Sequence, residues 1–138
     1  MDLLAVVAAA HEISMRAEDR IGPLLALHRL TPPTAHALWS IDPSEPPPSM
    51  KLMADRLYCN APNLTFLVNQ LVDRGLVTRA TDPSDRRSRV LTLTSRGREV
   101  REELVSTMLQ VTPFAVLDPS ELSQLAALLT RVTDASAG

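Results

Sequence analysis

Cysteine, glycine and aromatic residues are all scarce in this sequence. The 138 residues include one cysteine, four glycines and only 3% aromatic side chains. The lone Cys59 excludes a disulfide within the chain, and no Cys/His spacing matches a zinc site. The few glycines form no phosphate-binding loop, and no Ser/His/Asp set or carboxylate pair occurs in a context that favours catalysis. The sequence therefore predicts a protein that is not an enzyme and that holds no cofactor or metal.

Long hydrophobic runs and a secretion signal are also missing. The apolar start of the chain, residues 3–10, is short and follows Asp2 rather than basic residues, which argues against a signal peptide or a membrane span. The hydrophobic share of 45% is nevertheless ample for a core. Together with the single cysteine, these features predict a soluble protein of the reducing cytoplasm.

The charge is small in total but unevenly distributed along the chain. The net charge is -2, yet residues 51–101 carry ten Lys or Arg against five Asp or Glu, and the remainder carries four against eleven. A segregated basic segment suits contact with phosphate, because neutralising phosphates releases counterions. A solvated arginine-rich surface is the alternative explanation.

The most informative stretch is residues 75–97. Two β-branched runs, residues 76–80 and 89–94, flank a Pro/Asp turn that carries arginines, which predicts a two-stranded hairpin with a basic tip. Directly upstream, residues 49–58 and 60–74 predict two helices joined by a tight turn, since Ser49 and Asn60 are suitable N-caps. The helical pair and the hairpin together predict a winged helix-turn-helix whose target is duplex DNA.

The second helix of this pair is the expected recognition helix. Its periodicity predicts an apolar buried side made of Leu64, Leu67, Val68, Leu71 and Val72. The predicted exposed face consists of Asn63, Thr65, Phe66, Asn69 and Gln70. Side-chain amides can pair bidentately with adenine in the major groove, and an apolar ring can pack on a thymine methyl group. In the alternative arrangement Phe66 is a core residue and the exposed face is rotated by one position.

The remaining segments predict mostly helices. The preceding helix, residues 50–58, is expected to turn Leu52, Met53, Ala54 and Leu57 inward and Lys51, Asp55 and Arg56 outward. An N-terminal amphipathic helix should run to about residue 20, and Pro23 should mark a kink or a second helical turn that continues over residues 24–29. Residues 31–33 predict a break, residues 34–41 a short helix, and residues 42–49, with four prolines, a loop.

Two amphipathic helices are expected after the hairpin. The first begins with Thr94 or Ser95 as its cap and runs to about residue 111, and the second begins at Asp118 with Glu121 in a capping box. Together with the N-terminal helix they carry more apolar surface than a small winged lobe can cover, which predicts burial across a two-fold dimer interface. A monomeric helical bundle is the alternative.

The expected fold class is therefore mainly α with a small antiparallel β hairpin (α+β). Its expected division is N-terminal dimerisation helices at residues 1–30, a DNA-binding lobe at 31–97 and C-terminal dimerisation helices at 98–138.

The hairpin region resembles the multiple-antibiotic-resistance regulator (MarR) family of bacterial transcription factors. The match is strongest in the wing, Asp82-Pro83-Ser84-Asp85-Arg86-Arg87, and continues through the strand at residues 90–94 to Gly97. The segment before the wing matches at Leu71, Arg74, Gly75, Leu76, Val77 and Arg79. Order and lengths agree over residues 1–134, and the sequence match is strong over residues 49–97.

The resemblance implies a triangular homodimer with interleaved terminal helices and two winged lobes that read a pseudo-palindromic operator. It implies that Arg87 enters the minor groove, whose narrow form concentrates negative potential, and that Asp85 braces this arginine or its neighbour by a charge-assisted hydrogen bond. The expected DNA contacts combine the exposed helix face with Lys51, Arg86, Arg87 and Arg89. Relatives often carry a basic residue at the position of Phe66, whereas this helix has no Lys or Arg between Asn60 and Gln70. A hairpin held by its own ion pair and touching nothing is the structural alternative.

The resemblance also implies that DNA is released when a small molecule, commonly an anionic aromatic compound, binds between the dimer helices and the lobe. Several residues lie in segments that could line such a pocket, and the sequence assigns none of them as a contact: His11, Arg16, His28, His36 and Trp39. Cys59 is expected to pack at the corner of the helix pair, with a redox sensor as the alternative.

These features together predict a dimeric, ligand-responsive repressor that binds a pseudo-palindromic operator. The alternative is a winged-helix interaction module or antirepressor that no longer binds DNA, and a small-molecule scavenger is a third possibility.

Overall fold

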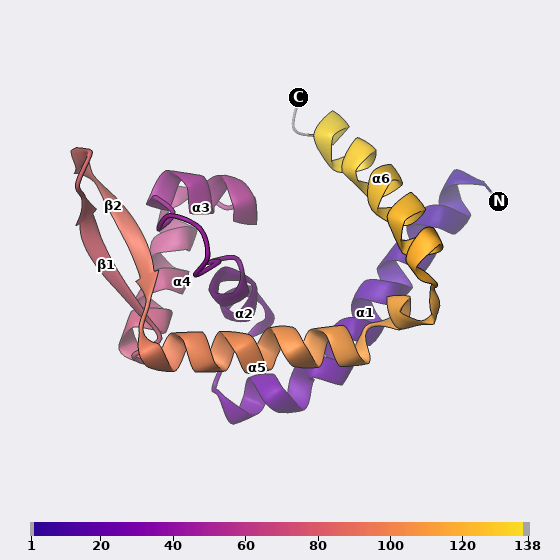
Figure 1. Ribbon diagram of the computed structural model, residues 1–138, viewed down its shortest axis with the longest axis horizontal. Helices are drawn as coiled ribbons and strands as arrows, with labels where there is room; N and C mark the ends of the chain where they lie inside the picture. Colours follow the sequence, from indigo (N-terminus) through magenta and orange to yellow (C-terminus); the bar gives the residue numbers. More distant parts are fainter. Residues whose placement is uncertain (1, 137–138) are drawn as a thin grey trace.

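Helices dominate the computed structural model, which describes residues 2–136 (Figure 1). In chain order the elements are α1 (Leu3–Leu27), α2 (Pro32–Trp39), α3 (Met50–Leu57), α4 (Ala61–Asp73), β1 (Val77–Asp82), β2 (Asp85–Leu93), α5 (Ser95–Val111), the 3-10 helix η1 (Pro113–Val116) and α6 (Pro119–Ser136). The expected mainly α class with one antiparallel hairpin is confirmed, and α2, α3, α4 and the hairpin form the winged helix-turn-helix lobe. Across the described chain, no helix combines the length and apolarity that crossing a membrane requires.

The predicted N-caps are confirmed. The side chains of Ser49, Asn60 and Thr94 each accept a hydrogen bond from the backbone N–H three residues further on, which starts α3, α4 and α5. At α6 the Asp118 carboxylate accepts from the Glu121 N–H at 2.8 Å, and the Glu121 carboxylate accepts from the Asp118 N–H at 3.1 Å. This reciprocal pair is the capping box that the sequence indicates.

The helix boundaries in the first forty residues differ from the prediction. α1 continues past residue 20 and through Pro23 to Leu27, because Ile21 and Leu25 on either side of the proline are buried in the core. Pro32 and Pro33 do not break the chain but form the first turn of α2, where a missing N–H costs nothing. Thr31 caps this helix, which therefore begins two residues earlier than predicted and ends at Trp39.

The hairpin is longer than its two β-branched runs. Val77 pairs with Leu93, Arg79 with Leu91 and Thr81 with Arg89, and the strands continue outward until only residues 83 and 84 remain between them. The Asp82 carboxylate accepts hydrogen bonds from the Ser84 N–H and hydroxyl, at 2.9 and 2.8 Å, which closes the turn. Arg86 and Arg87 consequently lie in β2 rather than in the turn itself.

The proline-rich loop, residues 42–49, packs against the hairpin. The Leu91 N–H donates to the Pro48 carbonyl at 2.9 Å, and Ser49 forms a bridge with Val90. Arg56 is half-buried beneath this loop and donates to the Ser40 carbonyl at 3.1 Å, so the prediction that it points outward was wrong. Leu52 was also wrongly placed, because it is 42% exposed rather than turned inward.

One hydrophobic core joins the lobe to the adjacent parts of α1 and α5. The buried side chains from these three regions include Ile21, Leu25, Leu38, Met53, Leu64, Val68, Leu71, Leu91, Val100 and Leu104. At Gly97 the start of α5 crosses the chain so closely that an added Cβ would lie 1.9 Å from the Leu76 carbonyl oxygen. The hairpin and α5 therefore meet at a glycine because no larger residue fits there.

Candidate nucleic-acid interface

α4 presents a polar face to solvent, on the side that the sequence predicts. Asn63, Thr65 and Asn69 are exposed, Phe66 is 63% exposed, and Gln70 is half-buried. The opposite side of the helix packs Leu64, Val68 and Leu71 into the core, with Leu67 and Val72 half-buried. The alternative that rotates Phe66 into the core is therefore wrong.

Two of these polar side chains already have partners. The Thr65 hydroxyl donates to the Ala61 carbonyl at 2.9 Å, within its own helix. The Asn69 carbonyl oxygen Oδ1 accepts a hydrogen bond of 2.7 Å from Nη1 of Arg79, which comes from β1. Arg79 thus brings a positive charge to a helix that has none between Asn60 and Gln70.

Arg79 was not among the residues predicted to lie at this surface. The signal that could have found it is the alternation along β1. Arg79 pairs with the buried Leu91, and partners in an antiparallel pair point to the same side of the sheet. That side is the one that α4 covers.

The hairpin arginines are exposed, and the acidic residues beside them bind backbone. Arg86, Arg87 and Arg89 are exposed along β2. Asp85 accepts a hydrogen bond from the backbone N–H of Arg87 at 3.0 Å, so it fixes the main chain at that residue instead of bracing a guanidinium. Hydrogen bonds from the Ser84 N–H and hydroxyl lower the pKa of Asp82, which keeps the turn carboxylate ionised.

An ion pair does not hold the hairpin together. Among residues 2–136 the ion pairs join Arg16 to Glu12, His28 to Glu103, Arg56 to Glu45 and Arg96 to Glu99, all outside β1 and β2. Within the hairpin Arg89 donates instead to the Thr81 hydroxyl at 3.3 Å. The charges of Arg86 and Arg87 thus remain available to an outside anion.

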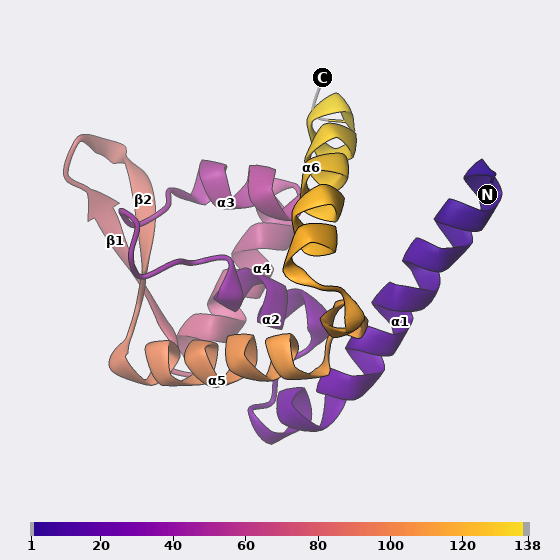
Figure 2. The same cartoon turned by 45° about the vertical axis from the view of Figure 1, so that its right-hand side comes forward.

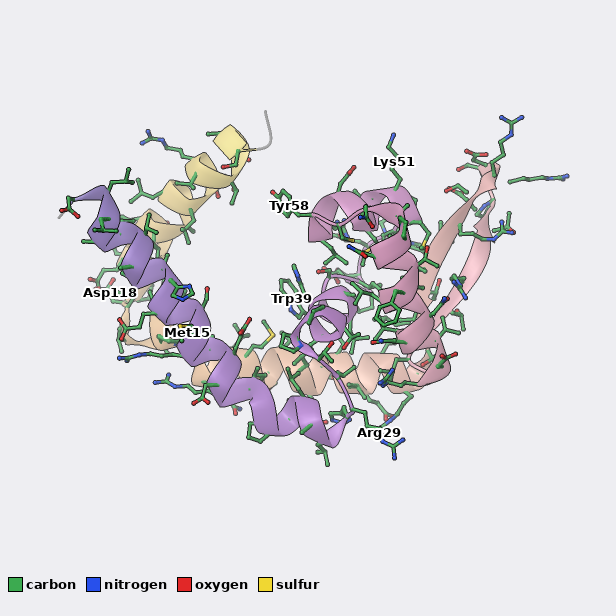
Figure 3. The ribbon with its side chains drawn as sticks, turned by 180° about the vertical axis from the view of Figure 1, so that it is seen from behind. Met15, Arg29, Trp39, Lys51, Tyr58 and Asp118 are labelled. Atoms are coloured by element: carbon green, nitrogen blue, oxygen red, sulfur yellow. The ribbon has the colours of Figure 1, made fainter. Side chains whose placement is uncertain are left out.

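The expected basic residue of α3 lies near this surface. Lys51 is exposed, and Figure 3 shows it projecting from the side of the lobe toward which the hairpin tip also extends. A helix with an exposed amide-rich face, flanked by a basic hairpin and a lysine, has the form of the elements that winged helix-turn-helix proteins place on duplex DNA.

A cavity of about 880 Å³ separates the lobe from the long helices. Its lining is mostly apolar and comes chiefly from α1, α2, α5 and η1, including Ile21, Leu25, Trp39, Leu104, Met108 and Phe114. The rings of His36 and Trp39 lie 4.8 Å apart at 33° and form an aromatic wall, and Figure 3 shows Trp39 on the side of the lobe that faces α1. Such a cavity suits a flat, largely apolar small molecule.

Few charged groups border this cavity. Among the described residues that line it, Glu18 is the single Asp, Glu, Lys or Arg. His36 also lines the cavity, and burial lowers its pKa, which favours the neutral imidazole. Arg20 donates to the carbonyl of Val111, a lining residue, at 2.8 Å, so a cation also lies at the rim.

The other residues considered for the pocket do not line it. His28 bonds to Glu103 at 3.0 Å, Arg16 bonds to Glu12 at 2.7 Å, and His11 is exposed on α1. Cys59 is half-buried and packs against the core at the turn between α3 and α4, as expected of an apolar filler. No group of three or more metal-binding side chains occurs in the described part of the chain.

The long helices carry apolar side chains that this chain does not cover. Those on α1 include Leu3, Leu4, Val6, Val7 and Met15, and those on α6 are Leu122, Leu128, Leu129 and Val132. No residue of α6 is buried along its described length, and the first half of α1 extends away from the lobe in both views (Figures 1 and 2). These helices therefore do not form the monomeric bundle that the sequence left open.

Comparison with known proteins identifies related regulators. The MarR family model matches residues 30–88. YkoM of Bacillus subtilis, described as an uncharacterized HTH-type transcriptional regulator, is 28% identical over 101 residues, which cover 72% of this chain and 66%, just under two thirds, of YkoM.

Two solved structures resemble this chain over more than nine tenths of its length. The transcriptional repressor CouR bound to a 23-mer DNA duplex is 25% identical, with a TM-score of 0.73 over 91% of this chain and 89% of CouR. The PcaV transcriptional regulator of Streptomyces coelicolor, in complex with its natural ligand, is also 25% identical, with a TM-score of 0.67 over 99% of this chain and 97% of PcaV.

Proposed function

We propose that this chain is a transcriptional regulator of the MarR family that binds duplex DNA as a homodimer in the bacterial cytoplasm. Members of this family are transcription regulators rather than enzymes. The observation that carries the proposal is the exposed polar face of α4 beside the arginines of β2. CouR, which shares the fold over nearly its whole length, was solved on a DNA duplex and supports the same role here.

In the proposed complex α4 enters the major groove and the hairpin reaches the neighbouring minor groove. Asn63, Phe66 and Gln70 meet base edges, while Arg87 places its guanidinium in the narrow groove, where the negative potential is concentrated. Lys51, Arg86 and Arg89 bind phosphates. Two lobes related by a two-fold axis then read half-sites about 34 Å apart, which corresponds to one helical turn.

The dimer would be formed by the long helices. A second copy that covers the exposed apolar residues of α1 and α6 would stabilise the protein, because burial of apolar surface contributes roughly 25 cal/mol of free energy for each Å² removed from water. Residues 1–30 and 98–138 then act chiefly in dimerisation and residues 31–97 in DNA binding.

The cavity between the lobe and the long helices is the proposed effector site. Its apolar lining and the His36–Trp39 wall favour an aromatic compound, and Arg20 at the rim suits a carboxylate on that compound. PcaV was solved with its natural ligand, which supports ligand control in a protein of this fold. Occupancy would lower the affinity for DNA by favouring a different separation of the two lobes.

Selection from a random pool of DNA duplexes tests the proposed function directly. The protein should enrich a pseudo-palindromic motif, and its affinity for that motif should fall steeply as salt rises, because several phosphate contacts release counterions. Failure to enrich any motif, together with passage through heparin at low salt, would instead favour an interaction module or antirepressor.

Fluorescence provides the matching test of the effector site. Trp39 is the only tryptophan in the sequence, so an aromatic compound that enters the cavity should quench or shift the emission of the whole protein. Salicylate and uncharged salicylamide form a suitable probe pair that differs mainly in charge. Quenching that accompanies release of the selected duplex supports a regulator, whereas quenching without any DNA binding favours a scavenger.

A further inference from the structure

The contact between Arg79 and Asn69 joins the hairpin to the expected recognition helix. The guanidinium Nη1 of Arg79 donates to Oδ1 of Asn69 at 2.7 Å, a short distance for a charge-assisted hydrogen bond. Among the described residues, no other side-chain hydrogen bond links β1 or β2 to α4. We infer that Arg79 is a positioning residue that fixes the hairpin against α4, and that Asn69 serves this junction instead of reading a base. The inference rests on the proposed DNA binding.

The location of Arg79 suits a positioning role. Its register partner Leu91 is fully buried, and the next pair outward on the same face of the hairpin, Thr81 and Arg89, is exposed on both strands. Arg79 therefore stands where the hairpin leaves the core and begins to project into solvent. The contact with Asn69 restrains the hairpin against α4 at this point.

The position of the hairpin tip depends strongly on the orientation of the strand at Arg79. Asp82, at the end of β1, lies three residues beyond Arg79, or about 10 Å at the usual rise of an extended strand. A small rotation at Arg79 thus displaces Arg86 and Arg87 by a larger distance. Because minor-groove contact depends on the placement of a guanidinium, the junction determines how well these arginines meet the DNA.

The contact with Arg79 disfavours the base-reading role predicted for the Asn69 amide. Reading adenine bidentately requires Oδ1 to accept from the adenine N6 amino group while Nδ2 donates to N7. Arginine has donors only, so the amide must turn Oδ1 toward Arg79. The carbonyl oxygen that adenine would need is therefore engaged by a cation. Base reading then falls to Asn63, Phe66 and Gln70.

A double-mutant cycle on the selected duplex tests the junction. Asn69→Ala and Arg79→Ala should each weaken binding by roughly five- to tenfold, and the double variant should be no weaker than either one, because both remove the same contact. Losses that multiply in the double variant would overturn the inference. Arg98→Ala, which removes an exposed arginine from α5, is the matched control and should change the affinity by less than about twofold.

The substitution Asn69→Asp separates positioning from base reading. Aspartate keeps an oxygen acceptor for Arg79 but has no amide donor, so it can hold the hairpin and cannot read adenine. Selection with this variant should return the wild-type motif, with affinity within about threefold of wild type. A changed base preference would show that Asn69 reads a base and would overturn the inference.

The outcomes distinguish this inference from the proposed function. If the wild-type protein enriches no motif, the DNA-binding role itself fails. If the wild type enriches a motif but Asn69→Ala shifts one of its bases, the role stands and the positioning inference fails. Both side chains are exposed, and unchanged circular dichroism and thermal melting of each variant would establish that any loss arises at the DNA surface.

Discussion

The winged lobe and the long helices of this chain differ in how completely they bury their apolar residues. The buried core extends from Ile21 to Leu104, so it includes the lobe together with the second half of α1 and the first half of α5. The first half of α1 and all of α6, here called the arm, expose their leucines and valines instead. One chain thus completes the core of the winged lobe by itself and leaves the apolar residues of the arm exposed, where a second copy would cover them in the proposed dimer.

The two regions also differ in charge. The basic excess lies within residues 51–101, whereas the rest of the chain is acidic. An acidic arm is poorly suited to a phosphate backbone, and an apolar one is well suited to another protein surface. The difference supports the proposed roles, nucleic-acid contact for the lobe and self-association for the arm.

The largest effect should come from a charge placed in the arm. Leu129→Glu on α6 buries a carboxylate in the proposed dimer contact, and loss of the dimer would uncouple the two half-sites and reduce operator affinity by about 100-fold or more. Analytical ultracentrifugation and duplex titration measure the two effects. Gln124→Glu, also exposed on α6, is the control, and a dimer that survives Leu129→Glu would contradict the role of the arm.

The next largest effect concerns the stability of the lobe. Gly97→Ala places a methyl group against the Leu76 carbonyl and should lower the free energy of unfolding by about 3 kcal/mol, near the upper end of overpacking costs. Gly22→Ala in α1 is the matched control, because an added Cβ there meets nothing within 4 Å, and it should raise stability by about 0.5–1 kcal/mol. Urea unfolding would show opposite shifts of midpoint, and equal shifts would contradict the close packing at Gly97.

A moderate effect should distinguish the arginines of the two regions. Arg87→Ala in β2 should weaken operator binding by about tenfold and reduce the dependence of log affinity on log salt by roughly 0.9, the value for one phosphate. Arg131→Ala in the arm removes the same charge and should leave both quantities nearly unchanged. Gel-shift titrations at several salt concentrations measure both, and equal losses in the two variants would remove the distinction.

The smallest effect should be a pH dependence at the boundary of the two regions. Burial lowers the pKa of His36 below 6.5, so the unfolded chain takes up a proton at a higher pH than the folded one. The corresponding stability is present above pH 6.5 and is lost as the pH falls through the lower folded pKa. His36→Gln should therefore reduce the slope of stability against pH below 6.5 in chemical unfolding, and an unchanged slope would assign the dependence to other groups.

Local chemistry predicted much of this fold from the sequence. Ser49, Asn60 and Asp118 cap helices because their side-chain oxygens reach the first N–H groups, and that depends on a few neighbouring residues only. The periodicity of α4 likewise places Leu64 and Val68 inside and Phe66 outside.

The remaining features depend on contacts between distant segments. Pro23 stays within α1 because buried residues on both sides hold the helix, which no local rule reveals. The Asn69–Arg79 contact depends on the angle between hairpin and helix, so the sequence indicated Asn69 alone at this surface, whereas the structure joins it to Arg79. Asp85 bonds to a backbone N–H for the same reason, since strand register decides which group lies within its reach.

The loop that packs on β2 also has a bearing on aggregation. An exposed strand margin offers unpaired N–H and carbonyl groups on which a foreign strand can assemble. Here the Leu91 N–H is already taken by Pro48, and Pro46, Pro47 and Pro48 have no N–H with which to recruit a further strand. The prolines thus end the sheet on this side, because they have no backbone N–H groups to donate to a further strand. Amyloid-like addition of strands is therefore disfavoured at this edge.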